Sequence, residues 1–504
     1  METRQVSQLT PNTHSIRMYG QFSLTNDADF ALFSSIRANG ILEPIVINSK
    51  NVIVSGVRRF MVAKMMLALK EVPVRVIDLN EVSELDVIEY NLQRIKNEVQ
   101  WTYELEVIRR EFGSKQGVKL TTDGKRKLDA FKAEVKKNVS DSTRKRVISA
   151  VKIQKELNPD KDEKEIWSEF SKEVEAGARV NSILKGLEAK KAKLINTERS
   201  KDYDSFQHEL FKIIQGDALN ASNQIEDNLI SCLMTSPPYW DYRIYDANEK
   251  KTRKIPLGNE PTVDGYIDAL VEIFKAYKSK MKSTTSIFIN VMDKIHKGQV
   301  AEIPSKLSKR MQEEGYKYIQ PIMWFKRNPQ YLTNPRMAQP SCEYILHFTL
   351  SVDDYYWDKY WTEQLESRDL MHEALYGEKG DVPLIRNLII PPTNEFQDGQ
   401  FVCPSMISTT VINNHSLNKL LESKGFQLTH SALYAYEIPM LCLLPTTQKG
   451  DVCLDVFSGL ATTGIVCYAT DRSYIGVENS KIYAAQSKAR FIELFKSKNP
   501  ADFV

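Results

Sequence analysis

The sequence predicts an α/β protein, with a mostly parallel sheet in the second half of the chain, a small α/β domain at its start and a helical region between them. From residue 208 onward, short apolar runs end at polar loops, as in "FKIIQGDAL", "NLISCLMTSPPY" and "DVCLDVFSGLATTG". Helical stretches such as "GYIDALVEIFKAYKSKM" separate these runs. This alternation is typical of parallel strands with helices on both faces of the sheet.

The small α/β domain is predicted from residues 30–78. Two β-branched runs, 45–47 and 52–54, flank the turn "NSKN", which indicates a pair of strands. A helix is expected over "VRRFMVAKMMLALK" and another strand over "VPVRVID". From about 85 to 200 the chain is rich in Lys and Glu and has few strand signals. We therefore predict domains at 1–100 and 206–504, joined by a helical, basic region and connector at 101–205.

Length, charge and cysteine usage limit the classes of protein that fit. A chain of 504 residues is too long for one hydrophobic core. Its net charge is only +3, so binding to nucleic acid would depend on local basic clusters. "TTDGKRK" (121–127) and "SDSTRKR" (140–146) are such clusters, and they favour DNA binding by 101–205, although each alone is also typical of a solvated helix face. Because no signal peptide, membrane-spanning run or CxxC pair is visible, we expect a cytosolic protein with reduced thiols.

The stretch "LDVFSGLATTGIVC" (454–467) reads as a strand, a turn of small residues and a helix start. Gly459 lets the turn tighten and lets a ligand approach the backbone. Thr462 and Thr463 are candidates to cap the helix or to contact a ligand carboxylate. The next strand ends at Glu478, an acid suited to ribose hydroxyls. Since neither GxGxxG nor a P-loop is present, we expect an adenosine-bearing cofactor other than a nicotinamide, with an ordinary strand–helix turn as the alternative.

The stretch "MTSPPYW" (234–240) forms a rigid corner that lacks donors. Pro237 and Pro238 fix φ and remove two backbone N–H groups. The Ser236 hydroxyl and backbone carbonyls remain as acceptors, and Tyr239 offers a flat face. Such a corner suits a planar base whose exocyclic amine donates both hydrogens, which localises the nitrogen lone pair for attack on a positioned methyl group. A purely structural Pro-Pro turn is the alternative.

Residues 208–493 resemble the S-adenosylmethionine-dependent amino-methylating DNA methyltransferases, whose fold is Rossmann-like, in the permuted β-class order. "MTSPPY" is similar to their catalytic motif in its Ser form, "DVFSGLATTG" to the methionine-binding motif and "IGVEN" to the ribose-binding motif. "GDAL", "IMWFKRNPQ…PRMAQPSCEYILHF" and "HSALYAYEIP" resemble flanking segments. The resemblance implies that the target amine and base are held by Ser236, Pro237, Pro238 and Tyr239. It implies an S-adenosylmethionine site formed by Asp455, Phe457, Gly459, Thr462, Glu478 and Asp217.

The resemblance also bears on the substrate. In this family the Ser form is associated with cytosine N4 and the Asp form with adenine N6, so we expect cytosine N4 in double-stranded DNA, with adenine N6 as the alternative. The family usually has Pro where Val456 stands and Gly where Ala461 stands. A weakened cofactor turn would leave a DNA-binding or clamp protein with little activity, and RNA methylation is a further option. We place target recognition in 350–430, and whether a cognate restriction endonuclease accompanies the chain stays open.

Residues 30–100 resemble the N-terminal domain of ParB, the chromosome-partition protein, through "ILEPIVI", "VIVSGVRRFMVAKMMLALKEVPVRVID" and "EYNLQR". In ParB-like proteins these loops bind CTP, so CTP or another nucleotide is a candidate partner. A glycine and arginines at a helix start suit phosphate. The candidate phosphate cradle comprises Gly56, Arg58, Arg59, Asn91 and Arg94. Val57 and Tyr90 stand where the family usually has Glu, which argues against hydrolysis.

Overall fold

The computed structural model describes residues 2–19, 27–92, 96–112, 122–241, 255–327, 341–361, 405–409, 414–427 and 433–496. The chain divides into two compact units, Met1–Lys191 and Ala192–Val504. This division has one boundary, between residues 191 and 192, so the predicted division into three parts at residues 100 and 205 stays a prediction.

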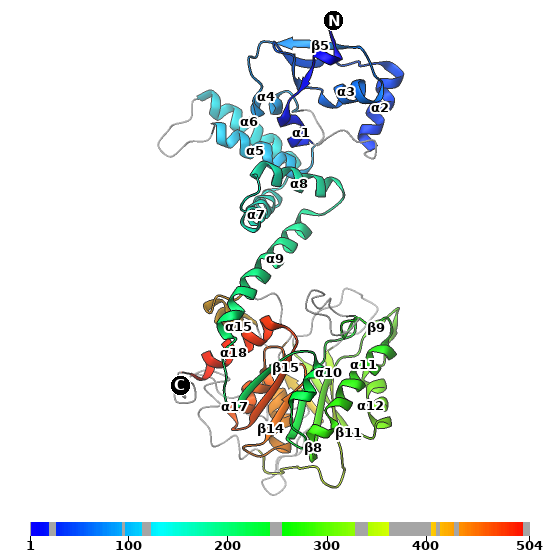
Figure 1. The fold of residues 1–504 in the computed structure, drawn as a ribbon, viewed down its shortest axis with the longest axis vertical. Coiled ribbons are helices and arrows are strands. Elements are labelled where there is room, and N and C mark those ends of the chain that lie inside the picture. Colours follow the sequence, from blue (N-terminus) through cyan, green and yellow to red (C-terminus); the bar gives the residue numbers. More distant parts are fainter. Residues whose placement is uncertain are drawn as a thin grey trace. The chain divides into compact units, whose positions relative to one another are not determined.

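A five-stranded sheet opens the first unit, with the strand order β1-β5-β3-β4-β2. Its strands are β1 (Glu2–Gln5), β2 (Thr10–Pro11), β3 (Ile45–Asn48), β4 (Val52–Ser55) and β5 (Glu71–Ile77) (Figure 1). β3 and β4 pair antiparallel, and Asn51 takes a φ of 60° in the turn between them. Every residue of β3 is buried. The two β-branched runs are therefore confirmed as strands.

The helices that accompany this sheet are α1 (Thr13–Tyr19), α2 (Asp27–Asn39), α3 (Val57–Met61) and α4 (Glu84–Glu89), with the short turns η1 (Val6–Gln8) and η2 (Val62–Met66). The helix predicted over "VRRFMVAKMMLALK" is shorter than expected, since its last, π-helical turn ends at Met66. Ala68 has a φ of 47°, and this left-handed conformation cannot continue a right-handed helix. The chain therefore leaves the helix before β5.

The described residues between 98 and 200 are almost all helical, as their composition predicts. The helices are α5 (Glu98–Phe112), α6 (Thr122–Asn138), α7 (Asp141–Leu157), α8 (Glu163–Glu175) and α9 (Val180–Ser200). Both basic clusters lie at helix starts, and α7 begins after Ser140, whose hydroxyl accepts a hydrogen bond from the Thr143 backbone N–H at 3.1 Å. Helices α4 to α9 share an apolar core that includes Leu105, Val135, Val147 and Phe170.

An eight-stranded sheet forms the centre of the second unit, with the order β13-β11-β12-β8-β7-β14-β15-β6. Its strands are β6 (Phe211–Gln215), β7 (Ile230–Thr235), β8 (Met281–Val291), β11 (Lys317–Lys326), β12 (Cys342–Thr349), β13 (Met406–Thr409), β14 (Val452–Asp455) and β15 (Ser473–Glu478); the hairpin β9 (Ile295–His296) and β10 (Gln299–Val300) is separate. Neighbouring strands are parallel except at β12, which is antiparallel to β8 and β11. The predicted, mostly parallel sheet is confirmed. Two late strands, β14 and β15, lie between β7 and β6.

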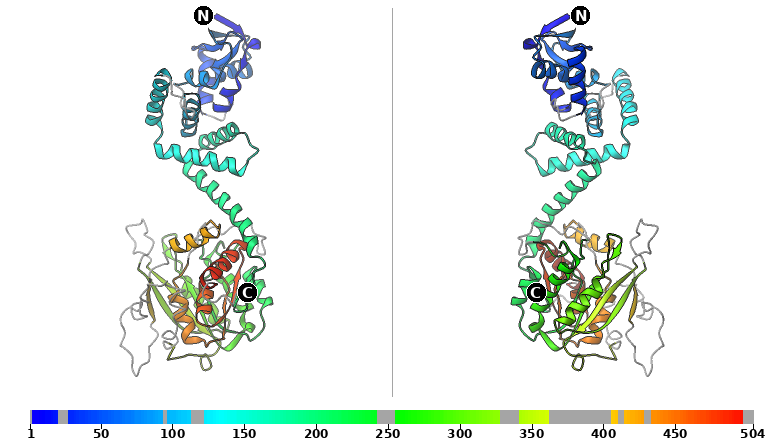
Figure 2. Two further views of the ribbon diagram at one scale, coloured as in Figure 1. Left: turned by 90° about the vertical axis from the view of Figure 1, so that its left-hand side faces the viewer. Right: turned by 90° about the vertical axis from the view of Figure 1, so that its right-hand side faces the viewer.

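Helices cover both faces of this sheet (Figures 1 and 2). One face carries α10 (Ala218–Ala221), α11 (Val263–Ala276) and α12 (Ile303–Glu313), and the other carries α16 (Glu437–Leu443), α17 (Thr462–Ala469) and α18 (Lys481–Phe495), while α15 (Asn414–Ser423) packs against α18. The remaining short turns are η3 (Lys201–Tyr203), η4 (Ser222–Gln224), η5 (Lys278–Lys280) and η7 (Leu444–Thr446). Successive residues of β7 face opposite cores, with Cys232 and Met234 in one and Leu233 in the other. A strand buried on both faces explains the continuous apolar run in the sequence.

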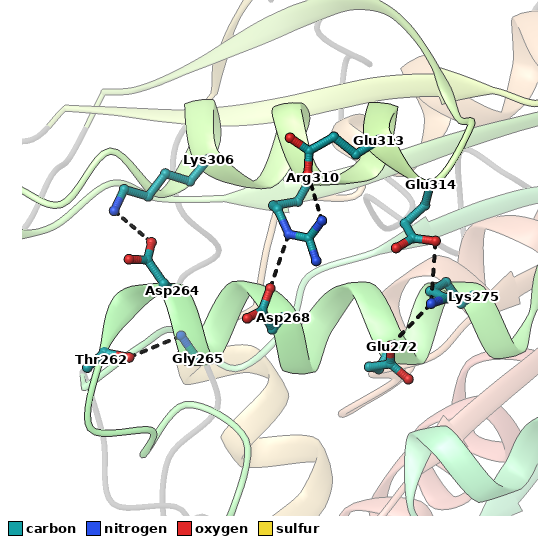
Figure 3. A network of polar contacts seen from close by, with 10 residues as sticks. All are labelled: Thr262, Asp264, Gly265, Asp268, Glu272, Lys275, Lys306, Arg310, Glu313 and Glu314. Carbon is teal, nitrogen blue, oxygen red and sulfur yellow. Dashed lines mark hydrogen bonds and ion pairs between the residues drawn. The ribbon is translucent and has the colours of Figure 1, made fainter.

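A row of ion pairs links α11 to α12 and to Glu314, the residue after α12, on the surface (Figure 3). It joins Lys306 to Asp264 at 2.7 Å, Arg310 to Asp268 at 3.1 Å and Lys275 to Glu314 at 3.4 Å. These side chains are solvent-accessible, so water and salt screen the pairs and each is expected to add little to the stability. Apolar burial accounts for most of the packing, since Leu270 and Leu307 have no exposed surface.

Several sequence predictions fall partly outside the described residues. Of the candidate recognition segment 350–430, only 350–361, 405–409 and 414–427 are described.

Among the described cysteines, Cys342 is partly buried and the others are fully buried free thiols: Cys232, Cys442, Cys453 and Cys467. In the part of the chain that the structure describes, no helix is long and apolar enough to cross a membrane.

Candidate active site

The order of the strands in the large sheet reverses between β7 and β14. From β7 the chain crosses through α11 to β8 on one side, and from β14 it crosses through α17 to β15 on the other. Open parallel sheets bind ligands at the carboxyl ends of the strands at such a switch point. Thr235, the last residue of β7, donates a hydrogen bond of 2.6 Å to Asp455, the last residue of β14. The two motifs predicted from the sequence are therefore neighbours in space.

The turn after β14 is open at Gly459 and is joined there to the end of β15. Gly459 has a φ of 53°, and its backbone N–H donates to Glu478 Oε2 at 2.8 Å. A Cβ placed on Gly459, or on Gly216 after β6, would meet nothing within 4 Å. Backbone at two strand ends is thus accessible to a ligand, and Phe457 adds a half-buried ring beside it. These features fit an adenosine-bearing cofactor.

Asp217 joins this group from the neighbouring strand end. β6 pairs with β15 so that Gln215 lies opposite Glu478, and the Gly216 backbone N–H donates to the Glu478 carbonyl oxygen at 3.0 Å. The Asp217 side chain caps α10 by accepting from the Leu219 backbone N–H at 3.0 Å. Two carboxylates therefore lie at adjacent strand ends beside the open turn.

Asp455 supports the turn from beneath. Only 1% of its surface is exposed, and its oxygens accept hydrogen bonds from Thr235 at 2.6 Å, the Phe457 backbone N–H at 3.1 Å, Thr463 at 3.0 Å and Tyr434 at 3.2 Å. Burial raises the pKa of Asp455, and these hydrogen bonds oppose the rise. The buried carboxylate therefore holds the turn and the end of β7 in place through hydrogen bonds.

Thr462 is also buried, and the helix cap expected from the sequence is wrong. The residue before α17 is Ala461, with a φ of 56°, and no side chain caps the helix. The Thr462 hydroxyl instead accepts a hydrogen bond of 3.2 Å from Arg490, which also donates to the Leu460 carbonyl oxygen at 2.7 Å. Arg490, which is 2% exposed, was not predicted from the sequence and holds the turn from α18.

The Ser-Pro-Pro-Tyr corner follows β7 directly and is braced from α11. Pro237 is buried, whereas Ser236, Pro238 and Tyr239 are partly exposed. The Tyr266 hydroxyl donates to the Pro238 carbonyl oxygen at 2.8 Å. One predicted backbone acceptor is therefore engaged, and the Ser236 hydroxyl becomes the main side-chain acceptor of the corner.

A polar network surrounds this corner and includes residues that the sequence did not reveal. The Tyr239 hydroxyl and Asn290 Nδ2 each donate to Glu343 Oε2 at 2.6 Å, and Lys326 forms an ion pair with Glu343 Oε1. The Ser236 hydroxyl lies 3.3 Å from the Asn290 carbonyl oxygen. Burial, and after it the charge of Glu343, holds the pKa of Tyr239 well above its ordinary value. Glu343 could have been noticed in the sequence, because it is an acid within the otherwise apolar run "CEYILHF".

In the first unit the candidate phosphate cradle is partly assembled. Gly56 has a φ of 98° and precedes α3. Next to it, the Ser55 hydroxyl donates to Asn91 Oδ1 at 3.3 Å, which brings the two loops together. Arg58 forms an ion pair with Asp29, and Arg59 pairs with Glu43 at 2.7 Å. Arg94 lies outside the described residues.

The family of the chain follows from a match over the large sheet. Residues 230–489 match the DNA methylase family of N6/N4 methyltransferases, and this range is more than half of the 504 residues. The chain belongs to this family. Methylases of this family use S-adenosylmethionine, so the predicted cofactor is confirmed at the level of the family. Residues 2–90 match the ParB N-terminal domain, so this methylase carries such a domain ahead of its methyltransferase part.

Relatives of this methylase include type II methyltransferases. It is 25% identical over 300 residues to M.Cfr9I of Citrobacter freundii, a match that covers 54% of this chain and 84% of that protein. It is 25% identical over 311 residues to M.SmaI of Serratia marcescens, covering 56% and 90%. A solved structure of the PvuII DNA methyltransferase, described as cytosine-N4-specific, is 19% identical, with a TM-score of 0.41, and covers 59% of this chain and 92% of that chain.

Proposed function

We propose that this methylase transfers a methyl group from S-adenosylmethionine to the N4 amine of a cytosine in double-stranded DNA. The observation that carries the proposal is the position of Ser236. It lies one residue after the buried end of β7, and Thr235 bonds directly to Asp455 at the start of the cofactor turn. The acceptor and the cofactor turn therefore meet at one edge of the sheet.

The residues at the neighbouring strand ends would hold the cofactor. Glu478 would accept hydrogen bonds from the ribose hydroxyls, and Asp217 would lie toward the adenine. The open turn at Gly459, with Phe457, would face the methionine end, while Asp455 and Thr462 would hold the turn in shape. Bound there, S-adenosylmethionine supplies the methyl group as a sulfonium.

The Ser-Pro-Pro-Tyr corner would hold the target base. A base within a duplex cannot reach this corner, so it must be flipped out of the stack. The Tyr239 ring would stack against the base, and the two prolines would keep the corner rigid. The Ser236 oxygen and a backbone carbonyl would accept from the amine and localise its lone pair. Proximity and electrostatics then provide the catalysis, without a covalent intermediate.

Cytosine N4 is proposed because the corner carries a neutral serine in place of an aspartate. Adenine N6 is the alternative target, and a DNA-binding or clamp protein with little activity is the alternative from another class. Val456 and Ala461, the two departures in the cofactor turn, are both buried in the structure. Cofactor binding measured by calorimetry separates a working turn from a defective one.

The test uses purified full-length protein, unmodified duplex DNA and methyl-labelled S-adenosylmethionine, with the product digested to nucleosides for mass spectrometry. We expect N4-methylcytosine. N6-methyladenine would keep the methyltransferase and replace the base. No methylated nucleoside across varied duplexes would refute the enzymatic proposal. Ser236→Ala should abolish transfer while cofactor and DNA binding persist.

Nucleotide binding by the ParB-like domain stays a prediction. In the structure Arg58 and Arg59 are paired with carboxylates, so a triphosphate would have to replace those partners. Calorimetry with CTP measures this directly, and the absence of heat at millimolar nucleotide would rule binding out. A cognate restriction endonuclease and a cytosolic location also stay predictions.

A further inference from the structure

Methylation of an exocyclic amine creates a proton that must leave. The nitrogen begins with two hydrogens, and the bond between the methyl group and sulfur breaks as the bond between the methyl group and nitrogen forms. The product nitrogen is then a strongly acidic cation until one hydrogen departs. A nearby group that accepts this proton would speed the step, and general-base assistance typically contributes about 10²- to 10⁴-fold.

The polar network beside Ser236 has the composition of a proton path. The Tyr239 phenol donates to Glu343 Oε2 at 2.6 Å, and the Ser236 hydroxyl donates to the Asn290 carbonyl oxygen at 3.3 Å. Asn290 spans the same atoms, since its Nδ2 lies 3.4 Å from Ser236 Oγ, 3.2 Å from the Tyr239 oxygen and 2.6 Å from Glu343 Oε2. Asn290 therefore brings the amine acceptor, the phenol and the carboxylate to one place.

Glu343 is placed to receive a proton and to return it. The residue is 4% exposed, and Lys326 holds its other oxygen in an ion pair. The other carboxylates near the corner are less suited to this role. The side-chain hydrogen bonds that Asp455 accepts come from Thr235, Tyr434 and Thr463 and not from the Ser236–Tyr239 network, and Asp241 is 62% exposed and paired with Lys294 at 2.6 Å.

We propose that Glu343 is the positioning residue and terminal proton acceptor of the methyl transfer, acting through Tyr239. As the nitrogen gains the methyl group, one of its hydrogens passes to Ser236 Oγ. The serine hydroxyl turns from the Asn290 carbonyl oxygen and passes its own proton to the Tyr239 oxygen, and the phenolic proton moves to Glu343 Oε2. The carboxylate becomes a carboxylic acid, and its ion pair with Lys326 is restored when the proton leaves to solvent. This inference rests on the proposed function and deepens it, because it assigns a route for the proton.

The test compares single-turnover methyl transfer by the full-length protein with saturating cofactor and DNA, which isolates the chemical step. Glu343→Gln keeps the shape but removes the carboxylate, and Tyr239→Phe keeps the stacking ring but removes the hydroxyl. Each should lower the transfer rate about 100-fold or more, with the dissociation constants for cofactor and DNA within threefold of wild type. Glu343→Asp, which retains a carboxylate, should recover part of the rate.

The double variant and a remote control separate a relay from a structural effect. If the two residues act in one path, Glu343→Gln combined with Tyr239→Phe is no slower than the slower single variant. Multiplied losses, or a Glu343→Gln rate within threefold of wild type, would overturn the inference. Glu313→Gln, a surface acid paired with Arg310 at 2.7 Å (Figure 3), should leave the rate unchanged. If Glu343→Gln fails to fold, Tyr239→Phe decides, since a wild-type rate there removes the path. Absence of transfer by the wild type would instead reject the proposed function.

Discussion

Gly464, in the first turn of α17, is a position at which alanine should destabilise the second unit even though alanine favours helices. A Cβ on this residue would lie 2.5 Å from Cδ1 and Cε1 of Tyr474 and 2.8 Å from Cε2 of Phe211. Carbon atoms pack best at about 3.5–4.0 Å, so the tyrosine ring would have to move by about 1 Å. Tyr474 is 1% exposed and its hydroxyl donates to Ser458 at 2.9 Å. A Cβ on Gly476 would lie 2.7 Å from the same hydroxyl oxygen and 2.8 Å from Cε1, so the backbone packs tightly along this edge of the ring.

The net effect is a balance of two terms. Alanine is favoured over glycine in a helix by about 1 kcal/mol. Overpacking a well-packed core costs about 1–3 kcal/mol, and more when the neighbours cannot move. The two terms leave a loss of up to about 2 kcal/mol in the free energy of unfolding of the second unit, and we expect Gly464→Ala near the upper end because Tyr474 has little room to move. Displacement of Tyr474 would also disturb Ser458 in the cofactor turn and weaken cofactor binding.

Calorimetric unfolding of the full chain tests this, with hydrogen exchange to assign each transition to its unit. Gly186, in α9, is the matched control because a Cβ there would meet nothing within 4 Å. Gly186→Ala should stabilise the first unit by about 0.5–1 kcal/mol. For Gly464→Ala we expect a melting temperature several degrees lower and a raised dissociation constant for S-adenosylmethionine. An increase in melting temperature in both variants would refute the packing argument.

Two further changes test supports of the fold that lie away from the reacting atoms. Arg490→Met leaves the Leu460 carbonyl oxygen buried without its donor, which should cost about 1–3 kcal/mol of stability. Calorimetry should then show S-adenosylmethionine binding that is at least tenfold weaker. Unchanged affinity would contradict the inference that Arg490 of α18 supports the cofactor turn. Glu84→Gln should destabilise the first unit at neutral pH. Burial alone would raise the pKa of Glu84, but hydrogen bonds from Lys164 and His14 outweigh it and lower the pKa. The stability that the carboxylate adds is therefore present above the unfolded pKa and lost as pH falls through the folded value, so urea unfolding curves of variant and wild type should converge in acid.

Residues next to strand ends were predictable because local chemistry marks them. Gly459, Glu478 and Asp217 each follow an apolar run, and parallel strands bring such ends to one edge of the sheet. The Pro-Pro corner was equally visible, since prolines constrain the backbone wherever they stand. What those residues touch was less predictable. Thr462 was expected at the ligand or as a helix cap, and it is buried beneath the turn.

The supporting residues could not be predicted because they depend on long-range register. Asn290 lies on β8 and pairs with Ile345 of β12, while Glu343 pairs with Trp324 of β11. The antiparallel direction of β12 brings these side chains to the corner after β7, and no pattern within one segment specifies that direction. Arg490 depends in the same way on how α18 packs.

The interleaving of β14 and β15 between β7 and β6 has a consequence for biosynthesis. As the chain leaves the ribosome, β6 and β7 are made early. The edge of β7 that faces β14 and the edge of β6 that faces β15 stay unpaired until residues 452–478 have followed. Until then both strands have open edges, and exposed edges of apolar strands are prone to pairing with other chains. The cofactor turn follows β14, so it cannot meet the Ser-Pro-Pro-Tyr corner before that stage. A partly synthesised chain therefore lacks a place to bring a methyl donor and a base together, so the methylase half becomes active only after its last strands have been inserted.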